Sequence, residues 1–140
     1  MKILLAVDGS AHTKRMLGYI AAHDELLGPG HEYTILKVVP PIPARDMRFL
    51  ERPNVEGYYD EEAEHVLAPV RAFAEQNHWT TRIVHAHGQA ADAIAARAAA
   101  DKADLIVMGT HGHGALGRLV LGSVSSGVLA RSNVPVLLVP

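Results

Sequence analysis

Cysteine is absent from this chain of 140 residues. Its absence excludes disulfides, thiolate metal sites and cysteine nucleophiles. An excess of one charge is missing as well, because 13 Lys and Arg stand against 15 Asp and Glu, for a formal net charge of −2. A chain whose basic residues are few and scattered lacks the positive field that attracts DNA or RNA. We therefore expect neither a disulfide scaffold nor a nucleic-acid partner.

Long apolar runs are also lacking. The first apolar segment, residues 3–7, ends at Asp8 and is too short for the core of a signal peptide. No later run reaches the roughly 20 residues of a membrane-spanning helix. The length suits one compact domain with a single core. We expect one domain over residues 1–140, cytoplasmic and without a membrane partner.

Short apolar segments alternate with helical patterns along the chain. A continuously apolar run followed by a turn is typical of a strand that is buried on both faces. The alternation predicts a doubly wound α/β fold, an open parallel sheet with helices on both faces. Strands are expected at residues 3–7, 33–39, 82–87, 104–108 and 136–139, helices at 13–27, 60–77, 89–102 and 124–131, and a long surface connection that could act as a lid at 40–58.

A glycine-rich stretch follows the fourth expected strand. Glycine allows a ligand to approach bare backbone amides, so this stretch indicates a site for an anion such as a phosphate chain. A P-loop is excluded because Arg118 stands where its Lys belongs and Leu119 replaces the hydroxyl that binds Mg²⁺. A dinucleotide fingerprint does not fit either, because it needs a further strand bearing an acid about twenty residues on. Only residues 131–140 follow at that distance.

A third spacing fits better, namely Gly109-x2-Gly112-x9-Gly122-Ser123. Ser123 is a good N-cap for the helix at 124–131, whose free amides and positive dipole end would face the loop. Together with the opening Lys2-Ile-Leu-Leu-Ala-Val-Asp8-Gly-Ser10 and the closing Pro135-Val-Leu-Leu-Val139, this spacing resembles the universal stress protein family. The resemblance covers essentially the whole chain.

The resemblance implies the Rossmann-like strand order 3-2-1-4-5, in which the first and fourth strands lie side by side. Ligands in such sheets lie beyond the carboxyl ends of the strands where the connections reverse. The resemblance further implies a regulatory, stress-response protein that binds ATP or a related adenine nucleotide with Mg²⁺. It also implies a homodimer through the last strand. No general base or nucleophile is visible near the loop apart from Asp8 and the histidines, so we expect no enzyme beyond slow ATP hydrolysis. The alternative is a family member that binds no nucleotide and acts by dimerisation and protein contacts.

Particular positions match the family's nucleotide site. The backbone at Val38 would read the adenine edge, and Asp8 would lie near the ribose and the metal. His113 stands where the family often has Arg or Lys, and an imidazole is only partly charged at neutral pH. The remaining matching positions are the pocket-lining Ala6, Val7 and Met108, the phosphate-binding Gly109, Gly112, Gly122 and Ser123, and Val124 and Ser125 of the following helix turn, where Ser125 would offer a hydroxyl to phosphate.

Each of these positions also has a purely structural interpretation. Asp8 could be a turn acid or helix cap that holds Gly9 and Ser10. Apolar strand residues are usually buried, so plain core packing explains each pocket-lining side chain taken alone. No general base or nucleophile lies near the loop apart from Asp8 and histidines, and for that reason no catalytic residue is assigned.

The chain has 9 histidines, and this number raises the question of a metal site. Two pairs are spaced for it, His85-x-His87 and His111-x-His113. Neither acids nor further histidines at ligand spacing accompany the strand pair in the sequence, so we expect no dedicated metal site.

Overall fold

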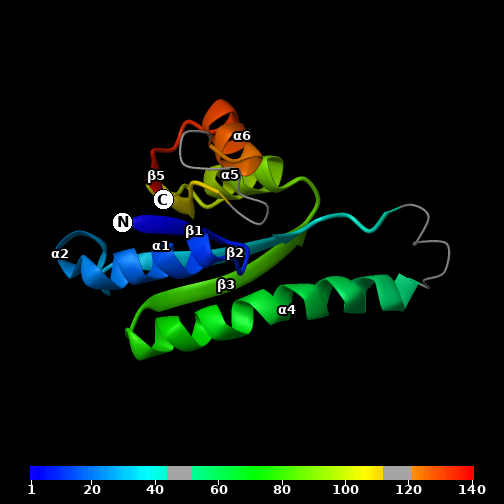
Figure 1. Cartoon of the computed structure of the whole chain (residues 1–140), viewed down its shortest axis with the longest axis horizontal. Coiled ribbons are helices and arrows are strands. Elements are labelled where there is room, and N and C mark those ends of the chain that lie inside the picture. The colour runs from blue at the N-terminus through cyan, green and yellow to red at the C-terminus, as the bar shows by residue number, and fades with distance from the viewer. Residues whose placement is uncertain (44–51, 112–120) are drawn as a thin grey trace.

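The computed structural model describes residues 1–43, 52–111 and 121–140, without the side chains of residues 52–54 (Figure 1). Its centre is a five-stranded parallel sheet in the order β3-β2-β1-β4-β5. The fold class and the strand order expected from the resemblance are therefore confirmed. The strands are β1 (Lys2–Val7), β2 (Glu32–Val39), β3 (Thr80–His87), β4 (Leu105–Gly109) and β5 (Val136–Val139).

Helices cover both faces of the sheet (Figure 1). Helices α1 and α4 pack on one face and α5 and α6 on the other. The helices are α1 (Ala11–Ala22), the short α2 (Asp24–Leu27), α4 (Arg52–Gln76), α5 (Ala90–Ala100) and α6 (Ser123–Arg131). Among the helices that the structure describes, none is long and apolar enough to cross a membrane.

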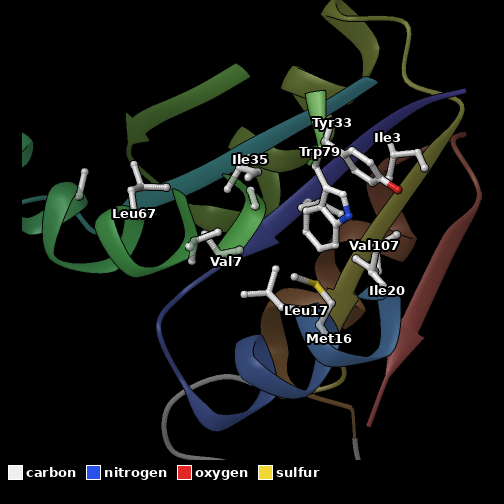
Figure 2. Close-up of a cluster of buried hydrophobic side chains, with 14 of the residues drawn as sticks. Ile3, Val7, Met16, Leu17, Ile20, Tyr33, Ile35, Leu67, Trp79 and Val107 are labelled. Atoms are coloured by element: carbon white, nitrogen blue, oxygen red, sulfur yellow. The ribbon is translucent and has the colours of Figure 1, made fainter. Parts of the chain in front are cut away.

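The strands are apolar throughout because their alternate residues enter two different cores. Ile3, Leu5 and Val7 of β1 point into the α1/α4 core, the buried cluster on that face of the sheet. Leu4 points into the α5/α6 core on the opposite face. Figure 2 shows Met16 and Ile20 of α1 close to the strand residues of the first core, among which Ile3 and Val107 are drawn. Burial on both faces removes the polar alternation of a half-exposed strand.

The expected helix at 13–27 is wrong in one respect, since it is divided in two at His23. The backbone of His23 has φ −122° and ψ 55°, outside the helical range. Its N–H donates to the carbonyl of Ile20 at 3.2 Å, and its ring Nδ1 lies 2.7 Å from the carbonyl oxygen of Tyr19. These local bonds end α1, and Asp24 then begins α2, whose Leu27 is fully buried.

The expected loop at 40–58 is also wrong in its second half, because α4 begins at Arg52. Val55, Tyr59 and Ala63 are spaced four apart and lie on one side of α4, where all three contact the α1/α4 core. Tyr59 is buried, and its hydroxyl accepts a hydrogen bond from the backbone N–H of Ile42 at 3.2 Å. The charged residues between these positions conceal the helical spacing in the sequence. The part of the expected lid at residues 44–51 lies outside the described residues.

Candidate functional site

A cavity of about 410 Å³ lies where the connections of the sheet reverse. It is bounded by the carboxyl ends of β1, β2 and β4 and by the first turns of α1 and α6. This is the position at which open parallel sheets bind ligands. Its lining includes the predicted Ala6, Val7, Asp8, Val38, Met108, Gly109, Gly122, Ser123, Val124 and Ser125.

The structure therefore brings together every predicted site residue that it describes. They come from three strands and one helix that are far apart in the sequence. Gly112 and His113 lie outside the described residues. The ligand roles of all these residues stay predictions, because a shared cavity establishes only their proximity.

Asp8 holds the turn between β1 and α1. Its Oδ1 accepts a hydrogen bond from the backbone N–H of Ser10 and another from the hydroxyl of Thr13, each at 2.9 Å. The backbone N–H of Asp8 in turn donates to Thr13 Oγ1 at 3.0 Å. The structural interpretation of Asp8 as a turn acid is thus correct, and the same carboxylate also lines the cavity.

Gly109 allows α1 to approach the end of β4. A Cβ atom at this position would lie 2.7 Å from Cβ of His12 and 3.1 Å from the carbonyl oxygen of His111. No real side chain tolerates the first distance without a shift of α1. Gly109 is therefore needed for packing, independently of any phosphate.

The start of α6 differs from the prediction in its cap. Gly122 is the N-cap, with φ −62° and ψ 160°, and Ser123 is the first helical residue. The expectation that Ser123 is the N-cap is therefore wrong, and no side chain of the described residues caps this helix. The first backbone N–H groups of a helix have no partner within it, and these amides of α6 border the cavity.

Ser125 ties α6 to the end of β4. Its side chain is only 2% exposed, and its hydroxyl lies 2.9 Å from the carbonyl oxygen of Gly109 and 3.0 Å from that of Thr110. The backbone N–H of Gly122 donates to the same Thr110 carbonyl at 2.8 Å. A hydroxyl carries one proton, and here protein carbonyls compete for it. Ser125 can donate to a phosphate only by giving up this bond.

Close packing against α5 fixes the other side of α6. A Cβ atom at Gly127 would lie 2.6 Å from Cβ of Ala91, so the glycine lets the two helices touch. Arg131 at the end of α6 pairs with Asp92 of α5, with 2.5 Å between Nε and Oδ1. The amides at the start of α6 are thereby held at a fixed distance from the sheet.

Sequence reasoning missed four polar residues of the cavity, namely His12, Thr13, Lys37 and His111. Lys37 lies on β2 beside Val7 in register. Burial lowers the pKa of Lys37, while the carboxylates of Asp8 and Glu62 act in the opposite direction. The signal in the sequence was a lone lysine inside the apolar run of residues 35–39, since lysine is seldom buried.

The histidines of β3 are engaged by α4. Nε2 of His85 lies 3.0 Å from Oδ1 of Asp60, and the ring of His87 stacks on Tyr59 with centroids 4.4 Å apart. The fold thus supplies an acid beside His85 that the local sequence did not reveal. Within residues 1–43, 52–111 and 121–140, no three histidines and acids come together as a group able to hold a metal ion.

Comparison with known proteins places this geometry in a family. The model of the universal stress protein family matches residues 1–140. A Thermus aquaticus relative, the universal stress protein in the QAH/OAS sulfhydrylase 3′ region, is 39% identical over 140 residues, which cover 98% of this chain and 96% of the relative. The solved structure of the hypothetical protein MJ0577 has a TM-score of 0.80 and 28% identity, over 99% of this chain and 94% of that one.

More distant structures share the fold and contain adenine nucleotides. The Arabidopsis thaliana family protein was solved with AMP bound; its TM-score is 0.70 and its identity 19%, over 99% of this chain and 90% of that one. A universal stress protein in complex with cAMP has a TM-score of 0.70 and 20% identity, over 100% of this chain and 97% of that one. The family match along all 140 residues and the identity to the Thermus relative lead to one conclusion: the chain belongs to the universal stress protein family.

Proposed function

We propose that this protein binds ATP or a related adenine nucleotide in the cavity at the ends of β1, β2 and β4, as a regulatory module of the stress response. The observation that carries the proposal is the position of the cavity. It lies at the reversal point of the sheet and gathers Asp8, Val38, Gly109 and the first turn of α6. The AMP and cAMP complexes of structural relatives support the choice of adenine nucleotides.

The lining divides into two parts that suit the two ends of a nucleotide. Leu36, Val38, Ile94 and Met108 form an apolar wall at the α5/α6 core, suited to a flat base. The first turn of α6 supplies backbone N–H groups and the positive end of a helix dipole, which together favour phosphate. We therefore place the base against Val38 and the phosphates toward Ser123.

A magnesium ion fits this arrangement as a companion of the phosphates. Mg²⁺ prefers oxygen ligands and is usually held by one or two carboxylates together with substrate phosphates. Asp8 supplies one carboxylate at the cavity wall. Asp8 would hold the ion, which would neutralise part of the phosphate charge.

We propose no catalytic role beyond slow hydrolysis. Loop amides and a helix N-terminus can hold a triphosphate without orienting an attacking water. Bound ATP should then turn over well below the about 1–100 s⁻¹ that is typical of kinases. Phosphate release from purified protein measures this rate directly, and release at a kinase-like rate would contradict the proposal.

We further propose that the protein is cytoplasmic and that it acts as a homodimer through β5. This strand is paired with β4 along one edge, and no described strand pairs with its other edge. Its residues alternate between the two cores, with Val136 and Leu138 against the α5/α6 core and Leu137 and Val139 against the α1/α4 core. An open apolar edge is usually covered or paired, and a two-fold contact would satisfy both copies at once. Sedimentation equilibrium at micromolar concentration should show a dimer, and a monomer would refute this part.

Calorimetric titration with Mg-ATP, AMP and cAMP tests the nucleotide proposal, together with mass spectrometry of ligand released from freshly purified protein. Gly122→Val should abolish binding, because its side chain would occupy the space at the start of α6. Gly57→Ala is the matched control, since a Cβ there meets nothing within 4 Å. Wild-type protein that binds none of the three would leave the non-nucleotide alternative.

A further inference from the structure

His12, in the first turn of α1, has an imidazole nitrogen that the fold leaves unsatisfied. Its Nδ1 is buried and has no hydrogen-bond partner among the residues that the structure describes. It is the one side-chain atom of these residues in that condition. A buried polar atom without a partner costs stability, so such atoms are rare and need an explanation. The same residue lines the cavity assigned above to the nucleotide.

A second imidazole lies next to His12. The ring of His111, which follows β4, has its centroid 5.5 Å from that of His12, at an interplanar angle of 42°. His111 also lines the cavity, and its Nδ1 lies 3.0 Å from Thr110 Oγ1. The Gly109 contact described above fixes the backbone of α1 against the strand end that carries His111. The pair is thus held by the fold at the ends of β1 and β4.

The charges around His12 come from several elements. Asp8 of β1, Lys37 of β2 and His111 after β4 line the same cavity, and Glu62 of α4 acts on Lys37. From α5 and α6, the described lining consists of uncharged residues, namely Ala90, Ile94, Ser123, Val124 and Ser125. The described lining contains no arginine and a single lysine.

Phosphate binding normally draws on fixed cations, and the described part of this cavity has little fixed positive charge. Lys37 is its one lysine, and burial already lowers the pKa of that side chain. Histidine is the side chain that ordinarily changes charge between about pH 5 and pH 8. In the described lining, the charged side chains at the β1–β4 end are thus the carboxylate of Asp8 and whichever of the two histidines is protonated.

We propose that His12 is a phosphate-binding residue of the nucleotide site, and that its protonation makes nucleotide affinity rise as the pH falls. This inference rests on the proposed function. A protonated imidazole has two N–H donors and a positive charge, and charge-assisted hydrogen bonds to phosphate are the strong ones. Nδ1 is covered in the structure, so a rotation of the imidazole ring would be needed to bring this unpartnered nitrogen to a phosphate in the cavity that His12 lines. The protein then loads with nucleotide when its surroundings become acidic.

The test compares wild type with His12→Gln, which keeps the Cβ contact to Gly109 and removes the titrating ring. AMP dissociation constants are measured by calorimetry at about pH 6 and about pH 8, on either side of the ordinary histidine range. The phosphate of AMP also titrates near pH 6, but this effect cancels in the ratio of the two proteins. We expect His12→Gln to bind AMP about tenfold more weakly at the lower pH, equivalent to about 1.4 kcal/mol, and nearly as well as wild type at the higher.

Two controls isolate the phosphate and the position. Adenosine has no phosphate, so its affinity should be equal in the two proteins at both pH values. His65→Gln makes the same substitution at an exposed position of α4 outside the cavity, and should leave AMP binding unchanged. His12→Lys supplies a fixed cation and should make AMP binding at the higher pH at least as tight as in wild type. Thermal unfolding confirms that each variant is folded, and His12→Asn serves in place of His12→Gln if the latter is not.

Equal AMP affinities of wild type and His12→Gln at both pH values would overturn the inference while leaving nucleotide binding intact. A tenfold loss that is the same at both pH values would also overturn it, because His12 would then act without titrating. If wild type binds no AMP, ATP or cAMP at either pH, the proposed function itself fails. These results are distinguishable from one another in a single set of titrations.

Discussion

The two helices that border the cavity begin in different ways. At the start of α1, Ser10 Oγ accepts a hydrogen bond from the backbone N–H of Thr13 at 3.4 Å, and Asp8 accepts one from the N–H of Ser10 at 2.9 Å. At the start of α6, Gly122 occupies the N-cap and makes no side-chain bond. Side-chain capping removes an amide from the set that a ligand can use, and a glycine cap leaves it available.

This difference assigns separate tasks to the two helix starts. The turn before α1 is closed by its own side chains, so α1 contributes side chains such as His12 to the cavity. The first turn of α6 also lines the cavity, and the first N–H groups of a helix have no partner within it, so we expect α6 to contribute backbone amides. A phosphate should therefore be held by the backbone on the α6 side and by side chains on the α1 side. Variants that add a side-chain cap to α6 or remove the one of α1 test whether the two helix starts have these different roles.

The largest effect is expected from giving α6 the kind of cap that α1 has. Gly122→Asp places a carboxylate at the N-cap, where it can accept from the helix amides and repel phosphate. We expect AMP affinity to fall by about a hundredfold or more, equivalent to about 2.7 kcal/mol. The free energy of unfolding should stay equal or rise by a few tenths of a kcal/mol. Calorimetry and urea denaturation measure the two quantities.

Gly122→Asn serves as the matched control for charge, because it caps a helix without a negative charge. Its loss of affinity should be smaller than that of the aspartate variant. Undiminished AMP binding by Gly122→Asp would show that phosphate does not use the start of α6.

The next largest effect is expected from detaching α6 from β4. Ser125→Ala removes the hydroxyl that reaches the carbonyls of Gly109 and Thr110. Loss of a buried hydrogen bond of this kind costs about 1–2 kcal/mol of unfolding free energy. AMP affinity should decrease too, because the amides of α6 lose their fixed position. A loss of stability with unchanged affinity would mean that α6 is placed by α5 alone.

A smaller effect is expected at α1. Ser10→Ala removes the side-chain cap, which typically costs about 1 kcal/mol of unfolding free energy. Ser10 is not among the residues that line the cavity, so AMP affinity should change by less than about twofold, or about 0.4 kcal/mol. Denaturation and titration of the same preparation separate the two effects. A large loss of AMP affinity in Ser10→Ala would mean that the start of α1 contributes to nucleotide binding as the start of α6 does.

The smallest effect is expected at Lys37, on β2, which pairs with the strand that leads into α1. Burial lowers the pKa of Lys37 in the folded state below the ordinary value of 10.5. Between the folded-state pKa and 10.5, the unfolded chain binds more protons than the folded one, so the free energy of unfolding rises with pH. Lys37→Met removes this group, and the free energy of unfolding should increase at neutral pH and lose its rise in the alkaline range. Urea denaturation from neutral pH to about pH 10.5 measures both. If the free energy of unfolding of Lys37→Met rises in the alkaline range as it does in wild type, a group other than Lys37 causes the rise.

The strands of the sheet could be predicted because strands that are buried on both faces are continuous apolar runs. Residues 3–7 and 33–39 are apolar runs with clear turns after them, and the observed β1 and β2 differ from them by one residue at the start. The strand order and the predicted cavity residues came from the resemblance to the family, and the rule that ligands bind at the carboxyl ends of parallel strands chose the same place. Neither step needed knowledge of side-chain packing.

The remaining features depend on contacts between distant segments. The start of α4 was missed because the helical face of Val55 and Tyr59 is interrupted by charged residues, and only the contact of Tyr59 with Ile42 and His87 reveals it. His12 and Lys37 were missed because each lies near the cavity only after the sheet forms. The N-cap was misplaced by one residue because Gly122 and Ser123 are both acceptable caps, and sequence preference does not decide between neighbours.

The cavity also takes its walls from both hydrophobic cores. Val7 belongs to the α1/α4 core, whereas Met108 and Ile94 belong to the α5/α6 core, and the sheet separates the two. A molecule seated there would have to leave before either layer could open. Ligand at a hundred times its dissociation constant adds about 2.7 kcal/mol to stability by mass action. Amide hydrogen exchange should therefore slow together in α1 and α6, two helices on opposite faces of the sheet, so that the nucleotide makes the two layers open as one cooperative unit.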